Sequence, residues 1–165
     1  MTVPVGWVAC QPGCAERAPP TLSPPLSVVL TEVDLRRLLA NGEQFTAEFI
    51  GEDGVPIADD HLVDAVVCLA NGHGGVVLVG VDDQGRVTGL RPRHGSYTDP
   101  ERVRSMIAGR TVPSCPVTCS IIAIDGLDVL AIEIPAGRPV TSTSEGVYRR
   151  RGTDAHGRPV CVPFL

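Results

Sequence analysis

Three consecutive arginines follow a tyrosine near the C-terminal end of this 165-residue chain. The segment Val147–Gly152 is typical of a strand, in which successive side chains point to opposite faces. Arg149 and Arg151 would share one face, and Arg150 would share the other with Tyr148. Arginine binds phosphate and tyrosine stacks on bases, so the segment predicts a nucleic-acid-binding surface.

The charge distribution favours such a surface although the net charge is −5. Residues 1–85 carry three arginines against twelve acidic side chains, and residues 86–165 carry eleven against seven, with no lysine anywhere. A local arginine patch can bind phosphate on an acidic protein. The predicted binding residues, with two arginines added from a loop, are Arg149, Arg151, Arg91, Arg93 and Tyr148. Ordinary solvated arginines, or a protein-interaction surface such as a homodimer contact, are the alternatives.

Six cysteines raise the question of a metal site. The pairs Cys10-x3-Cys14 and Cys115-x3-Cys119 have spacings near those of zinc ligands. The pairs are far apart in sequence, however, and the first lies in a proline-rich segment. Cys68, among small apolar residues of a predicted helix, is interpreted as a buried thiol.

A glycine-rich turn joins the two strongest predicted elements. Apolar residues over 62–70 predict a helix with Asp59 or Asp60 as its N-cap and a left-handed C-cap at Asn71-Gly72. Gly74 and Gly75 then provide the tight turn into Val76–Val81, whose continuous apolar character predicts a central strand. The order helix, glycines, strand is the reverse of a phosphate-binding loop, so no ATP phosphate loop is expected.

The remaining patterns complete a mixed fold. A capped helix is predicted from Thr31 to Asn41-Gly42, and residues 43–49 alternate as a strand with Phe45, Ala47 and Phe49 inward. Hairpins are predicted over 76–90 and 117–134, and a third helix begins at Asp99-Pro100. We therefore expect an α/β (α+β mixed) single domain, with a mixed sheet built from hairpins and about three helices.

The domain boundaries follow from composition. Prolines exclude regular structure over residues 1–27, which we interpret as an N-terminal tail. Residues 28–160 form the domain, and 161–165 are interpreted as the start of a C-terminal extension. No apolar run reaches the roughly 20 residues of a membrane helix, and we expect a cytoplasmic protein without a membrane partner.

Four motifs together resemble a known family over about residues 31–155. They are Glu43-x4-Glu48-Phe49, Leu69-Ala70-Asn71-x2-Gly74-Gly75-Val76-x-Leu78-x-Gly80-Val81-Asp82-Asp83, Val87-x-Gly89-Leu90 and Tyr148-Arg149-x-Arg151-Gly152-Thr153. The chain resembles the Schlafen AlbA-type domain, also called divergent AAA, of bacterial transcriptional regulators. This resemblance implies a nucleic-acid-binding module for DNA or RNA.

The same resemblance implies an alternative, because animal Schlafens with a similar core cleave structured RNA. Matched by residue, the catalytic and metal-binding carboxylates of those nucleases fall on Glu43, Glu48 and Asp82, with Asp83 as the fallback. Converging carboxylates would bind Mg²⁺ or Mn²⁺ and activate water. Family members commonly have Lys where this chain has Ile50, and loss of that cation favours a non-catalytic site.

Overall fold

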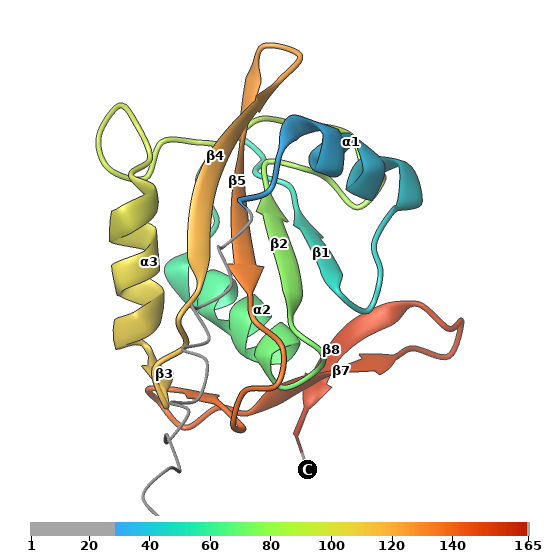
Figure 1. The fold of residues 1–165 in the computed structure, drawn as a ribbon, viewed down its shortest axis with the longest axis vertical. Coiled ribbons are helices and arrows are strands. Elements are labelled where there is room, and N and C mark those ends of the chain that lie inside the picture. The colour runs from blue at the N-terminus through green and yellow to red at the C-terminus, as the bar shows by residue number, and fades with distance from the viewer. Residues whose placement is uncertain (1–28, 165) are drawn as a thin grey trace, which may run out of the picture.

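The computed structural model describes residues 29–164, which form three helices and a mixed four-stranded sheet (Figure 1). The strand order is β1-β2-β5-β4, with β1 parallel to β2 and the other neighbours antiparallel. The strands are β1 (Ala47–Ile50), β2 (Gly75–Val79), β4 (Thr118–Ile124) and β5 (Leu127–Ile134). The predicted mixed α/β fold is confirmed.

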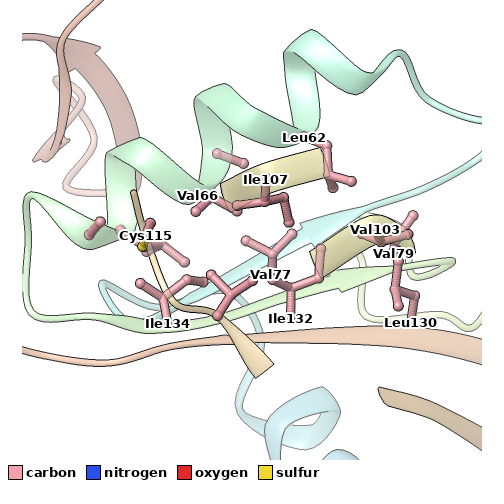
Figure 2. Close-up of a cluster of buried hydrophobic side chains, with 14 residues drawn as sticks. Leu62, Val66, Val77, Val79, Val103, Ile107, Cys115, Leu130, Ile132 and Ile134 are labelled. Atoms are coloured by element: carbon pink, nitrogen blue, oxygen red, sulfur yellow. The ribbon is translucent and has the colours of Figure 1, made fainter. Parts of the chain in front are cut away.

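Helices cover both faces of this sheet. They are α1 (Glu32–Asn41), α2 (Asp59–Ala70) and α3 (Pro100–Gly109). In β2, Val77 and Val79 pack with residues of α2 and α3 (Figure 2), whereas Val76 and Leu78 pack on the α1 side. The predicted central strand is therefore confirmed, since it is buried on both faces between two neighbours.

The N-caps of α1 and α3 are those predicted from the sequence, whereas the N-cap of α2 is not. Thr31 and Asp34 form a capping box at the start of α1, and Asp99 caps α3. The prediction for α2 is wrong at both ends: Ala58 occupies the N-cap without a side-chain bond, and Asn71 is right-handed. Asp59 and Asp60 lie in the first turn instead, where their charges favour the positive end of the helix dipole.

A positive φ was expected at Asn71-Gly72. It occurs instead at Gly74 and Gly75, whose φ angles are 70° and 136°. A β-carbon on Gly75 would lie 2.1 Å from the carbonyl oxygen of Thr46. That carbonyl accepts the first bond between the parallel strands, from the amide of Val76 at 2.9 Å. Both glycines are thus required by backbone conformation and close approach, as predicted.

Two small ribbons lie outside the main sheet. One pairs β3 (Thr111–Val112) with β6 (Ser142–Thr143), and the other pairs β7 (Arg149–Thr153) with β8 (Pro159–Pro163). The β7–β8 ribbon runs past the end of α2 and projects beyond β1 (Figure 1). Residues 161–163 are therefore part of a strand paired with β7, and not an extension separate from the domain.

Two further expectations need correction. Phe45 was predicted to face inward, but β1 begins only at Ala47 and the Phe45 side chain is exposed. The first predicted hairpin is reduced to one bridge between Val81 and Val87, because a tight turn follows β2 directly. Within residues 29–164, no helix has the length and apolar character needed to cross a membrane.

Candidate functional site

Helix α2 is surrounded by arginines that come from distant segments and pair with its carboxylates. The pairs are Arg93 with Asp59 at 3.3 Å, Arg110 with Asp60 at 2.6 Å, and Arg149 with Asp64 at 2.8 Å. Each pair joins the arginine-rich second half of the chain to the acidic first half. Part of the charge asymmetry seen in the sequence is therefore neutralised by ion pairs between the two halves.

Arg93 and Arg91, predicted together, have different environments. The Arg93 side chain is buried and donates to Glu52 Oε1 at 2.6 Å and to the Ile57 carbonyl at 2.8 Å. Arg91 donates only its backbone amide to Glu52 Oε2, at 2.6 Å, and its side chain is exposed. Arg93 therefore organises the loop before α2, whereas Arg91 remains accessible.

Arg151 was predicted to be exposed, and this is wrong: its side chain is 2% exposed. Its guanidinium pairs with Glu48 and donates to the carbonyls of Gln44 and Ala47 at 3.0 and 2.9 Å. Among the strands of residues 29–164, β1 lies at the edge of the sheet, and its Ala47 carbonyl also accepts the Gln44 amide at 3.2 Å. Arg151 thus adds a second donor to this carbonyl and covers the sheet edge.

Glu43 covers the same edge from the turn that precedes β1. Its Oε1 accepts the amide of Phe49 at 3.1 Å. Burial raises the pKa of the Glu48 carboxyl, Arg151 opposes this shift, and the nearby Glu43 charge adds to it. The two predicted glutamates are therefore neighbours, with Glu43 in the turn before β1 and Glu48 in the strand.

Asp82 is engaged in a turn that the chain uses twice. Its Oδ1 accepts the amides of Gln84 and Arg86 at 3.0 and 2.9 Å, and its Oδ2 accepts Arg86 Nε at 2.8 Å. Asp154 makes the equivalent three bonds with His156 and Arg158 at 2.8, 2.9 and 2.8 Å. Both turns read Asp-x-x-Gly-Arg.

This repetition explains Asp82 as a turn residue, and the amide of Arg86 lowers the pKa of its carboxyl. The fallback residue Asp83 is exposed. In residues 29–164, no cluster of three or more His, Cys, Asp or Glu side chains is arranged to hold a metal ion. Glu43, Glu48 and Asp82 are therefore not gathered as one ligand set.

The cysteines also differ from their predicted roles. Cys68 is not a free thiol but forms a disulfide with Cys161, which ties α2 to β8. Cys115 and Cys119 are free, and burial raises the pKa of both, that of Cys119 to about 12. Cys10 and Cys14 lie outside the described residues, so the structure does not test whether the two cysteine pairs could share a zinc ion.

Removing the disulfide is expected to lower stability, because Cys68 and Cys161 are 93 residues apart. Closing so long a loop restricts the unfolded chain, and we expect Cys161→Ser to lower the free energy of unfolding by about 2–4 kcal/mol. Urea unfolding should show this loss, and dithiothreitol should reproduce it in the unmodified chain. Cys119→Ser is the matched control. It keeps the disulfide, so dithiothreitol should still lower its free energy of unfolding. If dithiothreitol left the free energy of unfolding of the unmodified chain unchanged, the prediction would be wrong.

Asn71 fastens the ribbon to the end of α2. Its Nδ2 donates to the carbonyls of Thr141 and Arg149, and its Oδ1 accepts the Thr141 amide, all at 2.7 Å. Asn71 was predicted as a turn residue, and the structure adds this long-range role. With the disulfide and the Arg149–Asp64 pair, it fixes the inner side of β7 against α2.

Two hollows flank the Arg149–Asp64 pair. One, of about 400 Å³, is bordered by Asp60, Arg110, Ser144 and Glu145 among others. The other, of about 260 Å³, is bordered by Glu48, His61 and Cys161. Asp64 and His61 were not predicted as site residues, because α2 read only as a core helix.

The outer side of the ribbon contrasts with this ion-paired inner side. Arg150 is exposed, and no carboxylate of residues 29–164 pairs with it. It shares a face with Tyr148, as the strand pattern predicted, and the Tyr148 side chain is also exposed. An open hollow of about 600 Å³ beside Arg150 is bordered by Phe45, Gly152 and Val162.

These features define a small mixed α+β domain in which the β7–β8 ribbon is attached to α2 and to the edge strand β1. The chain belongs to the family described as Schlafen, AlbA_2, whose sequence profile matches residues 43–157. No match was found among curated proteins.

One solved structure shares the fold, and another is similar at a lower score. The DIP2311 protein from Corynebacterium diphtheriae is similar with a TM-score of 0.56 and 23% identity, over 80% of this chain and 26% of that one. The N-terminal domain of a RecG-related protein from Nitrosomonas europaea is similar with a TM-score of 0.47 and 22% identity, over 73% of this chain and 87% of that one. The chain thus spans about a quarter of the DIP2311 structure.

Proposed function

We propose that this chain is a nucleic-acid-binding module that contacts the sugar-phosphate backbone through exposed arginines, within a bacterial regulator. The observation that carries the proposal is the outer side of the β7–β8 ribbon, where Arg150 lies beside exposed Tyr148 and no carboxylate of the described residues pairs with it. Membership of the Schlafen AlbA-type family supports the same class of ligand. Arg91, exposed in its loop, is the second candidate contact.

The ion-paired arginines are less suited to this role than the sequence implied. A phosphate that approaches Arg149 also approaches Asp64, which repels it. Arg151 and Arg93 are buried and hold backbone carbonyls as well as carboxylates. We therefore assign the phosphate contact to Arg150, and we assign Arg149, Arg151 and Arg93 to positioning the ribbon and the loops beneath it.

Arg150→Ala should weaken binding to every nucleic-acid sequence and reduce the slope of log K against log salt by about 0.7–0.9, the value of one phosphate contact. Fluorescence anisotropy at several salt concentrations measures this slope on a labelled single strand, a duplex and a tRNA. Arg102→Ala, at an exposed position of α3, is the matched control and should change neither quantity. An unchanged slope in Arg150→Ala would remove Arg150 from the interface.

The same assay separates the alternatives. Binding that persists in EDTA, with intact RNA after incubation with Mn²⁺, fits a non-catalytic module. Cleavage that depends on Mn²⁺ and is lost in Glu48→Gln would support the metal-dependent endoribonuclease. Absence of binding to all three probes at low salt would favour a protein-interaction module.

A further inference from the structure

We propose that the outer side of the β7–β8 ribbon binds single-stranded nucleic acid by stacking unpaired bases on aromatic rings; this inference rests on the proposed function and names its ligand. We call this surface the outer ribbon face. It consists of Tyr148, which directly precedes β7, Arg150 and Gly152 of β7, their partners Val160, Val162 and Phe164, and the adjacent Phe45.

The strand register places the six ribbon residues on one surface, and Phe45 is placed beside them by the hollow that it borders with Arg150. Arg150 is opposite Val162, and the Phe164 amide donates to the Tyr148 carbonyl at 3.1 Å, which continues the pairing by one residue. Residues directly opposite each other in an antiparallel pair share a face. The alternate residues Arg149, Arg151 and Cys161 point inward, to Asp64, Glu48 and Cys68. The outer ribbon face therefore points away from the body of the domain.

Aromatic side chains are scarce in this chain, yet three of them gather here. The described residues include five phenylalanines and tyrosines, of which only Phe49 is buried. Phe45, Tyr148 and Phe164 belong to the outer ribbon face and are 42%, 46% and 40% exposed. Exposing rings to water is unfavourable, so a cluster of exposed rings indicates a surface that is covered when a partner binds.

The charge of this face selects the partner. Its seven members include no carboxylate, and Arg150 supplies one unneutralised positive charge. Aromatic rings interleaved with arginine are the combination that binds single strands, in which bases stack on the rings while the cation contacts phosphate. Duplex bases are already stacked on each other and cannot reach such rings. A single strand is therefore the ligand that uses both the rings and the guanidinium.

The hollow beside Arg150 provides space for a base. It measures about 600 Å³, opens to solvent and is bordered by Phe45 and Gly152. Gly152 contributes no side chain to the hollow, and the Val162 side chain lies next to it. Phe45 and Arg150 thus border the same hollow, and Tyr148 precedes Arg150 by two residues on the same face of the ribbon.

The test compares a labelled oligo-dT with a duplex of the same length, in EDTA and at low salt, using the full 165-residue chain. Tyr148→Ala and Phe45→Ala should each weaken single-strand binding roughly 5- to 150-fold, the range for loss of one stacked base. Tyr148→Phe should retain binding because the ring remains. Tyr97→Ala, which removes an exposed ring elsewhere, is the matched control and should have no effect. Unchanged thermal unfolding would show that the variants are folded.

The remaining outcomes overturn the inference in distinguishable ways. If Arg150→Ala weakens both probes while Tyr148→Ala and Phe45→Ala weaken neither, stacking is wrong and backbone binding stands. Tighter binding of the duplex than of the single strand also contradicts stacking. If neither probe binds, both this inference and the proposed function fail. Self-association that disappears in the Tyr148→Ala, Phe45→Ala double variant would instead identify a second copy of the chain as the occupant of the face.

Discussion

Gly75→Ala is expected to lower the free energy of unfolding by at least about 3 kcal/mol, because two penalties combine at this position. The backbone φ of 136° is one that residues with a side chain rarely adopt. The added β-carbon would also lie 2.1 Å from the Thr46 carbonyl oxygen, so β1 and β2 would have to separate where their pairing begins. Urea unfolding followed by circular dichroism measures the loss.

Gly54→Ala is the matched control for this experiment. Gly54 also has a positive φ, of 80°, but a β-carbon there would meet nothing within 4 Å. Its expected cost is about 1 kcal/mol, from backbone conformation alone. The excess loss in Gly75→Ala therefore measures the close approach of the strands together with the less accessible φ of 136°. Equal losses in Gly75→Ala and Gly54→Ala would contradict the packing of β1 on β2 described above.

Arg151→Met should cost about 3–5 kcal/mol, the range for removing one partner of a buried ion pair. The substitution leaves Glu48 without its cation and removes the side-chain donors to the carbonyls of Gln44 and Ala47, which keep only the backbone bonds that join these two residues. Arg150→Met, at the exposed neighbouring position, is the control and should change stability little. An Arg151→Met variant as stable as this control would contradict the burial of the guanidinium.

The loss in Arg151→Met should also depend on pH. Burial raises the pKa of Glu48 and Arg151 opposes this shift, so the pKa rises further once the arginine is gone. A carboxyl whose pKa is higher in the folded than in the unfolded state stabilises the fold as the pH falls. The difference in stability between Arg151→Met and the unmodified chain should therefore be smaller in mild acid than at neutral pH. Adding Glu48→Gln should recover part of the loss at neutral pH.

Features encoded by neighbouring residues could be predicted from the sequence. Thr31 and Asp34 are three residues apart and cap α1 as expected. The apolar run of β2 and the positive φ of Gly74 and Gly75 likewise follow from local chemistry. Strand β8 was missed because Pro159 and Pro163 bound it, and proline at both ends of a short segment argues against a strand.

The partners of distant side chains could not be predicted in this way. A run of arginines reads as an exposed patch, and nothing within the run indicates that Arg151 is buried against Glu48 while Arg150 is not. Cys68 likewise gives no local sign of its bond to Cys161. The tertiary fold decides which polar groups meet, and it moved the candidate interface from the inner to the outer side of β7.

The pairing of acids in the first half of the chain with arginines in the second has a consequence for synthesis on the ribosome. When α2 has emerged, Asp60 and Asp64 have no cation to meet until Arg110 and Arg149 have also been made. Glu48 has no partner until Arg151 is synthesised, more than one hundred residues later. Contacts so distant in sequence slow folding, because the chain must close long loops before it gains their stabilisation. The nascent domain is thus expected to remain expanded and acidic, and to become compact only when β7 leaves the exit tunnel.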